Sequence, residues 1–242
     1  MSHTEIITRR SLPHWFVPGA AHFVTYRLYG TLPAAKLQQL RARKANLLRE
    51  EPRPGETPVG RRERIHKQLF ATYDGWLDAG TGARWLADPR VAALVRSNLY
   101  HHHGSKYHLL AYCVMSNHVH VLLEPLEHGG GRAGRSPAHR EDEDVGEGSD
   151  ERSPLAGIMH SLKSYTAHEA NKLLQRSGPF WQPESYDHWV RDDDELERIV
   201  AYIAANPVQA GLVERAHDWF FCSAHDRFLT DGQTSGWLRW PS

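Results

Sequence analysis

Residues 115–125 read MSNHVHVLLEP, and the fold prediction starts from this stretch. The residues just before it, 107–114, are mostly apolar, and Ser116-Asn117 can form a tight turn. Residues 118–123 then continue with the composition of a β-strand. The sequence therefore predicts a β-hairpin over residues 107–124. Successive strand side chains point to opposite faces of a sheet, so we expect His118 and His120 to share one face.

Two histidines on one strand face are candidate ligands for a single divalent metal. Neutral imidazole nitrogens are common metal ligands. Two of them leave coordination positions open for an oxygen ligand and a substrate phosphate. His118 and His120 are the candidates here. The alternative is a polar or packed pair without a metal, because the chain has 17 histidines.

The length of 242 residues allows one α/β domain with a full core. We find no apolar window long enough to span a membrane and no signal-peptide core. The two cysteines, Cys113 and Cys222, have neither metal-binding nor redox spacing. These features predict a cytoplasmic protein.

The formal net charge of zero conceals an uneven distribution of charge. Residues 1–125 carry 17 Lys and Arg against 9 Asp and Glu, whereas residues 126–153 carry 4 against 8. The segment with the excess of positive charge, residues 1–125, therefore includes the histidine pair. Local basic patches attract nucleic-acid phosphates, although a solvated surface without a partner is the alternative.

Helices and further strands are expected on both sides of the hairpin. A strand is predicted at 21–30, and helices are predicted from Pro33, over 61–78 and from Pro89. After the hairpin we expect a Gly-rich acidic linker at 126–152, since it has almost no apolar residues. A helix at 153–177, a strand at 184–190 and a helix ended by Asn206-Pro207 complete the pattern.

Four motifs in order, preceded by a fifth near the N-terminus, resemble a known family. The hairpin motif Met-x-Asn-His-Val-His is followed by a helix with Lys163 and Tyr165. GPFWQ at 178–182 and YIAANPVQAGLV at 202–213 come next, and RRSLPH at 9–14 precedes the first strand. This order resembles the HUH single-tyrosine transposases of the IS200-like family, and within it the REP-associated tyrosine transposases. The resemblance covers most of the chain outside the acidic linker. Ser116 departs from it, because proline is commoner there.

The resemblance implies a ferredoxin-like antiparallel sheet flanked by helices, of the α/β (α+β) class. It implies one transposase domain over 1–242, with a basic arm at 1–20, the linker at 126–152 and an extension at 207–242. The implied partner is single-stranded hairpin DNA, bound by a monomer or homodimer without a membrane, and the protein would be nucleoid-associated.

The same resemblance implies the chemistry. Tyr165 would attack a DNA phosphate and form a 5′-phosphotyrosine, with Mg²⁺ or Mn²⁺ held by His118 and His120. Glu169, one turn after the tyrosine, would be the third metal ligand, and His168 is a weaker candidate. The candidate DNA contacts are Arg9, Arg10, His14, Arg27, Asn117 and Lys163. Two alternatives stay open: a DNA-hairpin-binding protein of the same descent without cleavage, and a metal phosphohydrolase that uses water.

Overall fold

The computed structural model describes residues 17–80, 82–126 and 153–226. Arg9, Arg10, His14, nearly all of the acidic linker and the chain after residue 226 lie outside the described residues. No helix within the described ranges is both long and apolar enough to cross a membrane.

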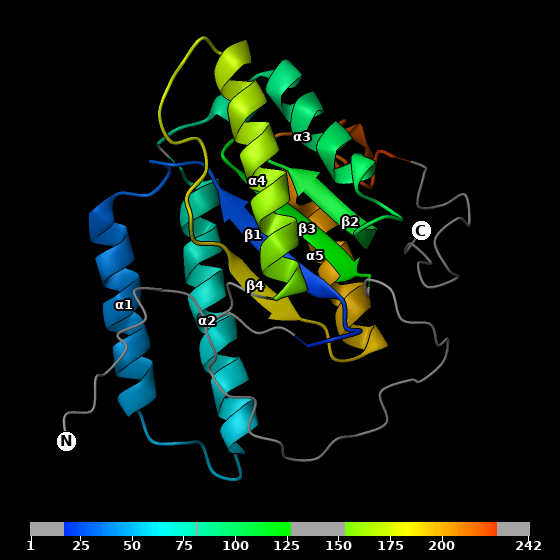
Figure 1. The fold of residues 1–242 in the computed structure, drawn as a ribbon. Helices are drawn as coiled ribbons and strands as arrows, with labels where there is room; N and C mark the ends of the chain where they lie inside the picture. Colours follow the sequence, from blue (N-terminus) through cyan, green and yellow to red (C-terminus); the bar gives the residue numbers. More distant parts are fainter. Residues whose placement is uncertain (1–16, 81, 127–152, 227–242) are drawn as a thin grey trace, which may run out of the picture.

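The elements follow the predicted order closely (Figure 1). The strands are β1 (His22–Arg27), β2 (Tyr107–Val114), β3 (His118–Pro125) and β4 (Tyr186–Trp189). The helices are α1 (Ala34–Arg49), α2 (Pro58–Asp78), α3 (Pro89–His101), α4 (Pro154–Leu173) and α5 (Asp193–Gln209). Two short 3-10 turns lie at Trp85–Ala87 and Ala216–Asp218.

The four strands form one antiparallel sheet in the order β2-β3-β1-β4. The hairpin is therefore confirmed, and its second strand is central. With helices between β1 and β2 and between β3 and β4, the connectivity is β-α-β-β-α-β, which is the ferredoxin-like arrangement. The expected α+β fold class is confirmed.

One face of the sheet packs against α3 and α4, which lie in front of it in Figure 1. Alternation along the strands sends Val24 and Tyr26 of β1 and Val119 and Val121 of β3 to this face. These side chains join α4 residues such as Leu162 in one apolar core.

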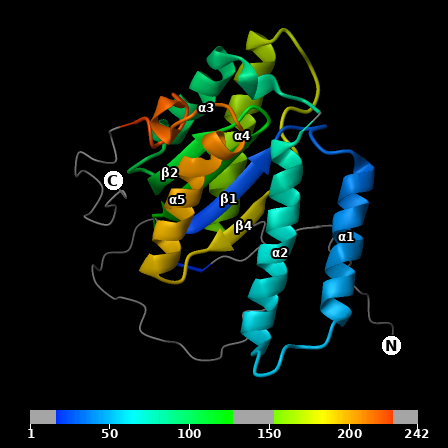
Figure 2. The same ribbon diagram turned by 180° about the vertical axis from the view of Figure 1, so that it is seen from behind.

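The opposite face packs against α2 and α5, as Figure 2 shows from behind. Phe23 of β1 and Leu122 of β3 enter this second core, together with Leu69 of α2 and Ile203 of α5. Because His118 and His120 alternate with the residues of the first core, their side chains point to this second face, toward α2 and α5.

Helix α5 does not stop at Asn206-Pro207 as expected, but runs through Pro207 to Gln209. Proline removes only one helix hydrogen bond, and here it does so in the last turn, where the cost is small. The carbonyl of Ile203, which lost that partner, lies 3.9 Å from the Cys222 thiol.

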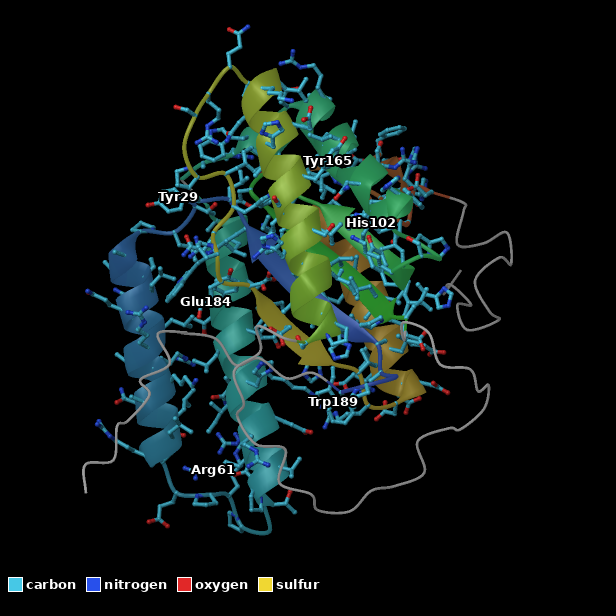
Figure 3. All side chains as sticks on the ribbon, in the orientation of Figure 1. Tyr29, Arg61, His102, Tyr165, Glu184 and Trp189 are labelled. Carbon is cyan, nitrogen blue, oxygen red and sulfur yellow. The ribbon has the colours of Figure 1, made fainter. Side chains whose placement is uncertain are left out.

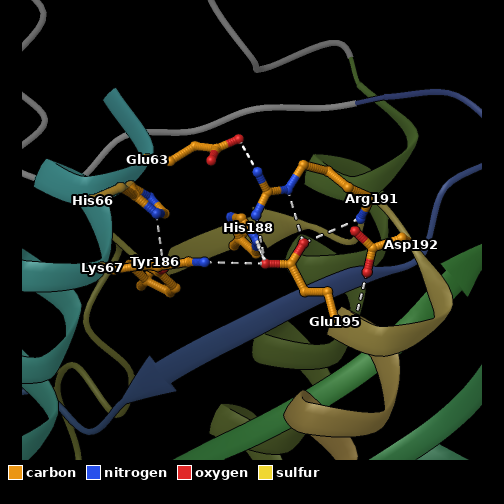
Figure 4. Close-up of polar contacts among 8 residues, drawn as sticks. All are labelled: Glu63, His66, Lys67, Tyr186, His188, Arg191, Asp192 and Glu195. Carbon is orange, nitrogen blue, oxygen red and sulfur yellow. Dashed lines mark hydrogen bonds and ion pairs between the residues drawn. The ribbon is translucent and has the colours of Figure 1, made fainter. Parts of the chain in front are cut away.

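A charged cluster fixes the first turn of α5 to β4 and α2 (Figure 4). The buried Glu195 carboxylate accepts two hydrogen bonds from the Arg191 guanidinium and a third from the Arg191 backbone N–H. Its Oε1 lies 3.2 Å from His188 Nε2 and 3.7 Å from Lys67 Nζ. Arg191 also pairs with Glu63 of α2. The start of α5 is therefore tied to its neighbours by charge as well as by apolar contacts.

Candidate metal centre and active site

His118 and His120 lie side by side on the buried face of β3. Their Nε2 atoms are 3.0 Å apart, and both side chains are fully buried. Asp74 on α2 completes the group, with its Oδ1 3.5 Å from His120 Nε2. The three candidate ligand atoms all lie within 4.8 Å of one another. Two imidazoles and a carboxylate in this arrangement form a possible site for a divalent metal.

Burial sets the protonation of this group. It lowers the pKa of His118 well below its usual range and that of His120 to about 3, so both rings are neutral at neutral pH. Burial also raises the pKa of Asp74 to about 6, against the opposing effect of a hydrogen bond from Tyr202. Its Oδ1 has no hydrogen-bond donor among the described residues. A cation would supply the missing partner, so the residues present fit a metal.

Helix α5 brings a tyrosine to the same group. The hydroxyl of Tyr202 donates a hydrogen bond to Asp74 Oδ2, and its ring centre lies 5.5 Å from that of His120. Asn206, one turn later, is fully buried and its side chain lies beside the Tyr202 hydroxyl. A partly exposed phenol is thus held next to three candidate metal ligands, and the amide oxygen of Asn206 is a further possible ligand.

Two polar side chains hold the histidine rings. Asn117 Oδ1 lies 2.6 Å from His118 Nδ1, and Thr25 Oγ1 lies 2.8 Å from His120 Nδ1. Both residues are buried. Asn117, expected as a DNA contact, therefore has its side chain directed into the protein rather than toward solvent.

The structure does not bring Tyr165 and Glu169 to the histidine pair. Both lie on α4, which packs on the other face, so the sheet itself separates them from the imidazoles. Tyr165, which Figure 3 labels, is 52% exposed. The Glu169 carboxylate pairs with Lys172 at 2.8 Å. His168, on the same helix, lies near Glu169 rather than near the pair.

Lys163 and Arg27 are the two remaining described residues that were expected to contact DNA. Lys163 on α4 donates to the backbone carbonyls of Gln182 and Pro183. Arg27 is buried at the end of β1, directly across from His118 in the strand register, and its side chain interacts with Tyr73. Arg27 therefore brings a positive charge to the face that holds the candidate metal centre.

Asp74, Tyr202 and Asn206 were not assigned roles by the sequence reasoning, although each left a signal. Asp74 is a carboxylate among the buried side chains of α2, between Tyr73 and Leu77. Tyr202 and Asn206 are four residues apart on α5, so they lie on the same side of that helix. Polar groups on an otherwise apolar helix face are the pattern that points to a buried site.

The fold and site together define a ferredoxin-like protein in which a His-x-His strand, a buried carboxylate and a helix tyrosine converge. Comparisons with known proteins identify its relatives. A protein of Haemophilus influenzae, provisionally named a REP-associated tyrosine transposase, is 27% identical over 119 residues, or 49% of this chain and 60% of that protein. The REP-associated tyrosine transposase of Escherichia coli is 38% identical over 45 residues, or 19% of this chain and 27% of that protein.

The resemblance drawn from the motifs is thus confirmed, and the chain is related to the REP-associated tyrosine transposases. Its match spans less than two thirds of the length of either curated relative. A solved structure of a REP-associated tyrosine transposase bound to a REP hairpin has a TM-score of 0.42 and 16% identity, covering 91% of this chain and 85% of that one. No protein-family model matches the chain.

Proposed function

We propose that this chain is a metal-dependent enzyme that cuts and rejoins single-stranded DNA, with Tyr202 as its nucleophile. The observation that carries the proposal is the hydrogen bond from the Tyr202 hydroxyl to Asp74, beside the His118 and His120 pair. The names of the curated relatives support the same reaction class. REP-like hairpin DNA is the proposed substrate.

In the proposed reaction, the Tyr202 oxygen attacks the scissile phosphorus, and the bond from phosphorus to the 3′ oxygen breaks. The products are a 5′-phosphotyrosine and a free 3′-hydroxyl, and a second 3′-hydroxyl can reverse the step and join strands. Asp74 Oδ2 already accepts the hydrogen bond of the phenol, so it is placed to take the proton. Mg²⁺ or Mn²⁺ held by Asp74, His118 and His120 would neutralise charge on the phosphate oxygens.

Substrate contacts follow from the charges around this site. Arg27 is the proposed contact for the scissile phosphate, because it is a cation on the same sheet face and pairs in register with His118. Arg9, Arg10 and His14 remain proposed contacts for the flanking hairpin. Tyr202 is partly exposed whereas the histidines are fully buried, so the phosphate would approach from the side of α5.

A metal phosphohydrolase is the second candidate function. The specific observation in its favour is Asp74, which adds a carboxylate to the two histidines. Water would replace Tyr202 as the nucleophile, and no covalent protein–DNA species would form. The two functions therefore differ in whether the Tyr202 phenol becomes covalently attached to DNA.

The test is incubation of labelled hairpin oligonucleotides with the full chain and Mn²⁺, followed by denaturing electrophoresis. We expect a covalent protein–DNA adduct that Tyr202→Phe abolishes while DNA binding persists. Tyr165→Phe is the matched control and should leave the adduct unchanged. Cleavage that survives Tyr202→Phe without an adduct would favour the hydrolase, and loss of the adduct only in Tyr165→Phe would overturn the assignment of Tyr202. Binding without any cleavage would leave a DNA-hairpin-binding protein.

A further inference from the structure

Asn117 joins three elements at the candidate metal centre. Its Nδ2 donates to the backbone carbonyl of Leu77 at the end of α2, at 2.8 Å. Its Oδ1 faces His118 Nδ1 at 2.6 Å, and its own backbone carbonyl accepts from Leu28 N after β1. The residue is 2% exposed, so water does not compete for these contacts.

These contacts determine which nitrogen of His118 carries the hydrogen. A backbone carbonyl only accepts, so the amide atom that faces Leu77 must be the NH₂ group. The amide oxygen then faces His118, and an amide oxygen also only accepts. The Nδ1 of His118 must therefore be the N–H donor. In a neutral imidazole this leaves the lone pair on Nε2, which is the atom nearest to His120.

We propose that Asn117 is a positioning residue for metal binding: it fixes His118 in the Nδ1–H tautomer and thereby presents the Nε2 lone pair to the cation. The inference rests on the proposed function, because it assumes that His118 is a metal ligand. It assigns to Asn117 a role inside the protein instead of one in DNA contact. An acceptor that holds the far nitrogen of a metal-binding histidine also fixes the orientation of the ring.

Thr25 holds His120 in a different way. Two nitrogen lone pairs 3.0 Å apart repel, so the gap between the Nε2 atoms must contain a hydrogen or a cation. If a hydrogen fills the gap, it is bonded to Nε2 of His120. The Nδ1 of His120 then accepts a hydrogen bond from the Thr25 hydroxyl. With a cation there, His120 carries its hydrogen on Nδ1 and donates to the same hydroxyl. A hydroxyl can donate or accept, whereas an amide oxygen cannot donate, so Thr25 permits both tautomers.

The experiment is ¹⁵N NMR of the full chain labelled at histidine, without metal and with Mg²⁺. The signal of His118 is assigned by its loss in His118→Gln. We expect a pyrrole-type Nδ1 for His118 in both conditions, and a change of tautomer for His120 only when Mg²⁺ is added. Wild-type protein alone tests the inference, because an Nε2–H tautomer of His118 would overturn it whatever the variants do.

Variants then connect the tautomer to metal affinity, measured by calorimetry with Mn²⁺. Asn117→Ala should weaken Mn²⁺ binding by about 10- to 100-fold and lose the fixed tautomer. Asn117→Asp keeps an acceptor facing Nδ1 and should keep the tautomer, while it loses the hydrogen bond to the Leu77 carbonyl. Thr25→Ser should bind like wild type, and the similarly sized Thr25→Val should bind more weakly. An Asn117→Ala protein that keeps both the tautomer and the affinity would contradict the proposal.

The outcome for Asn117 is separable from the outcome for the enzyme. A fixed His118 tautomer with tight Mn²⁺ binding but no protein–DNA adduct would support the role of Asn117 and reject the transesterase. An adduct formed by a protein in which His118 is an Nε2–H tautomer would support the transesterase and reject the role of Asn117. The two experiments therefore fail independently.

Discussion

At the scale of single residues, the candidate metal centre depends on a position without a side chain. Gly80 follows α2, and a Cβ built there would lie 2.4 Å from Asn117 Nδ2 and 2.7 Å from the Leu77 carbonyl. Both distances are shorter than real Cβ contacts. Glycine at this position is what allows the Asn117 amide to reach the end of α2.

We therefore expect Gly80→Ala to displace Asn117 and to weaken Mn²⁺ binding in the same direction as Asn117→Ala. The crowding should also lower the free energy of unfolding by about 1–3 kcal/mol. Calorimetry and urea denaturation measure the two effects. Gly75→Ala is the matched control, because Gly75 lies inside α2 and a Cβ added there would have nothing within 4 Å. It should raise stability by up to about 1 kcal/mol and leave affinity unchanged; equal affinities for both variants would count against the role of Gly80.

At the scale of elements, α5 is the helix whose placement matters most for the proposed reaction, because it carries Tyr202, the proposed nucleophile. Its first turn is held by Glu195, which hydrogen bonds to Arg191 and lies close to His188. Burial raises the pKa of Glu195, but these partners outweigh it and hold the pKa well below the usual range. A lowered carboxyl pKa stabilises the fold above the unfolded pKa, and this stabilisation is lost as the pH falls toward the folded pKa.

Replacing Glu195 by Gln should therefore lower the free energy of unfolding at pH 7 by about 3 kcal/mol, since it leaves Arg191 with one fewer partner. The difference from wild type should shrink as the pH falls below about 4.5. Urea denaturation between pH 3 and pH 8 measures it. Glu197→Gln, on the exposed side of the same helix, is the control and should change stability little. A difference that stays constant over this pH range would contradict the assigned role of the Glu195 charge.

Elements were more predictable than their arrangement. Periodicity and turn residues predicted the hairpin, the helix at α4 and the shared face of His118 and His120, because these features depend on neighbours in sequence. Long-range packing determines which face of the sheet each helix covers, and no local sequence pattern predicts that face. Tyr165 and Tyr202 both lie on helices that follow the hairpin, and only the fold shows that α5 is the helix on the side of the histidines.

At the scale of the whole molecule, the candidate ligands come from distant parts of the chain. Asp74 lies on α2, the histidines lie on β3, and Asn206 lies on α5 beside Tyr202. A cation held between α2 and β3 would bind the folded chain and not the unfolded one. Metal binding and folding should therefore be coupled.

We expect Mn²⁺ at 100 times its Kd to stabilise the folded chain by about 2.7 kcal/mol, which corresponds to a rise in Tm of about 5–10 °C. Thermal unfolding followed by circular dichroism, with and without the ion, measures the shift. His120→Gln should unfold at a Tm that does not depend on Mn²⁺. A rise of equal size in that variant would show that the ion acts elsewhere on the protein.

The separation of the two cores by the sheet has a practical consequence for studying this protein. The α4 surface around Tyr165 is open to solvent, yet it lies on the opposite face of the four-stranded sheet from the imidazoles. A fluorescent dye attached at position 165 would report on tumbling or on the arrival of a large ligand without disturbing the candidate metal ligands. Tyr165, the nucleophile expected from the sequence, is thus a suitable attachment point for a probe of the proposed reaction.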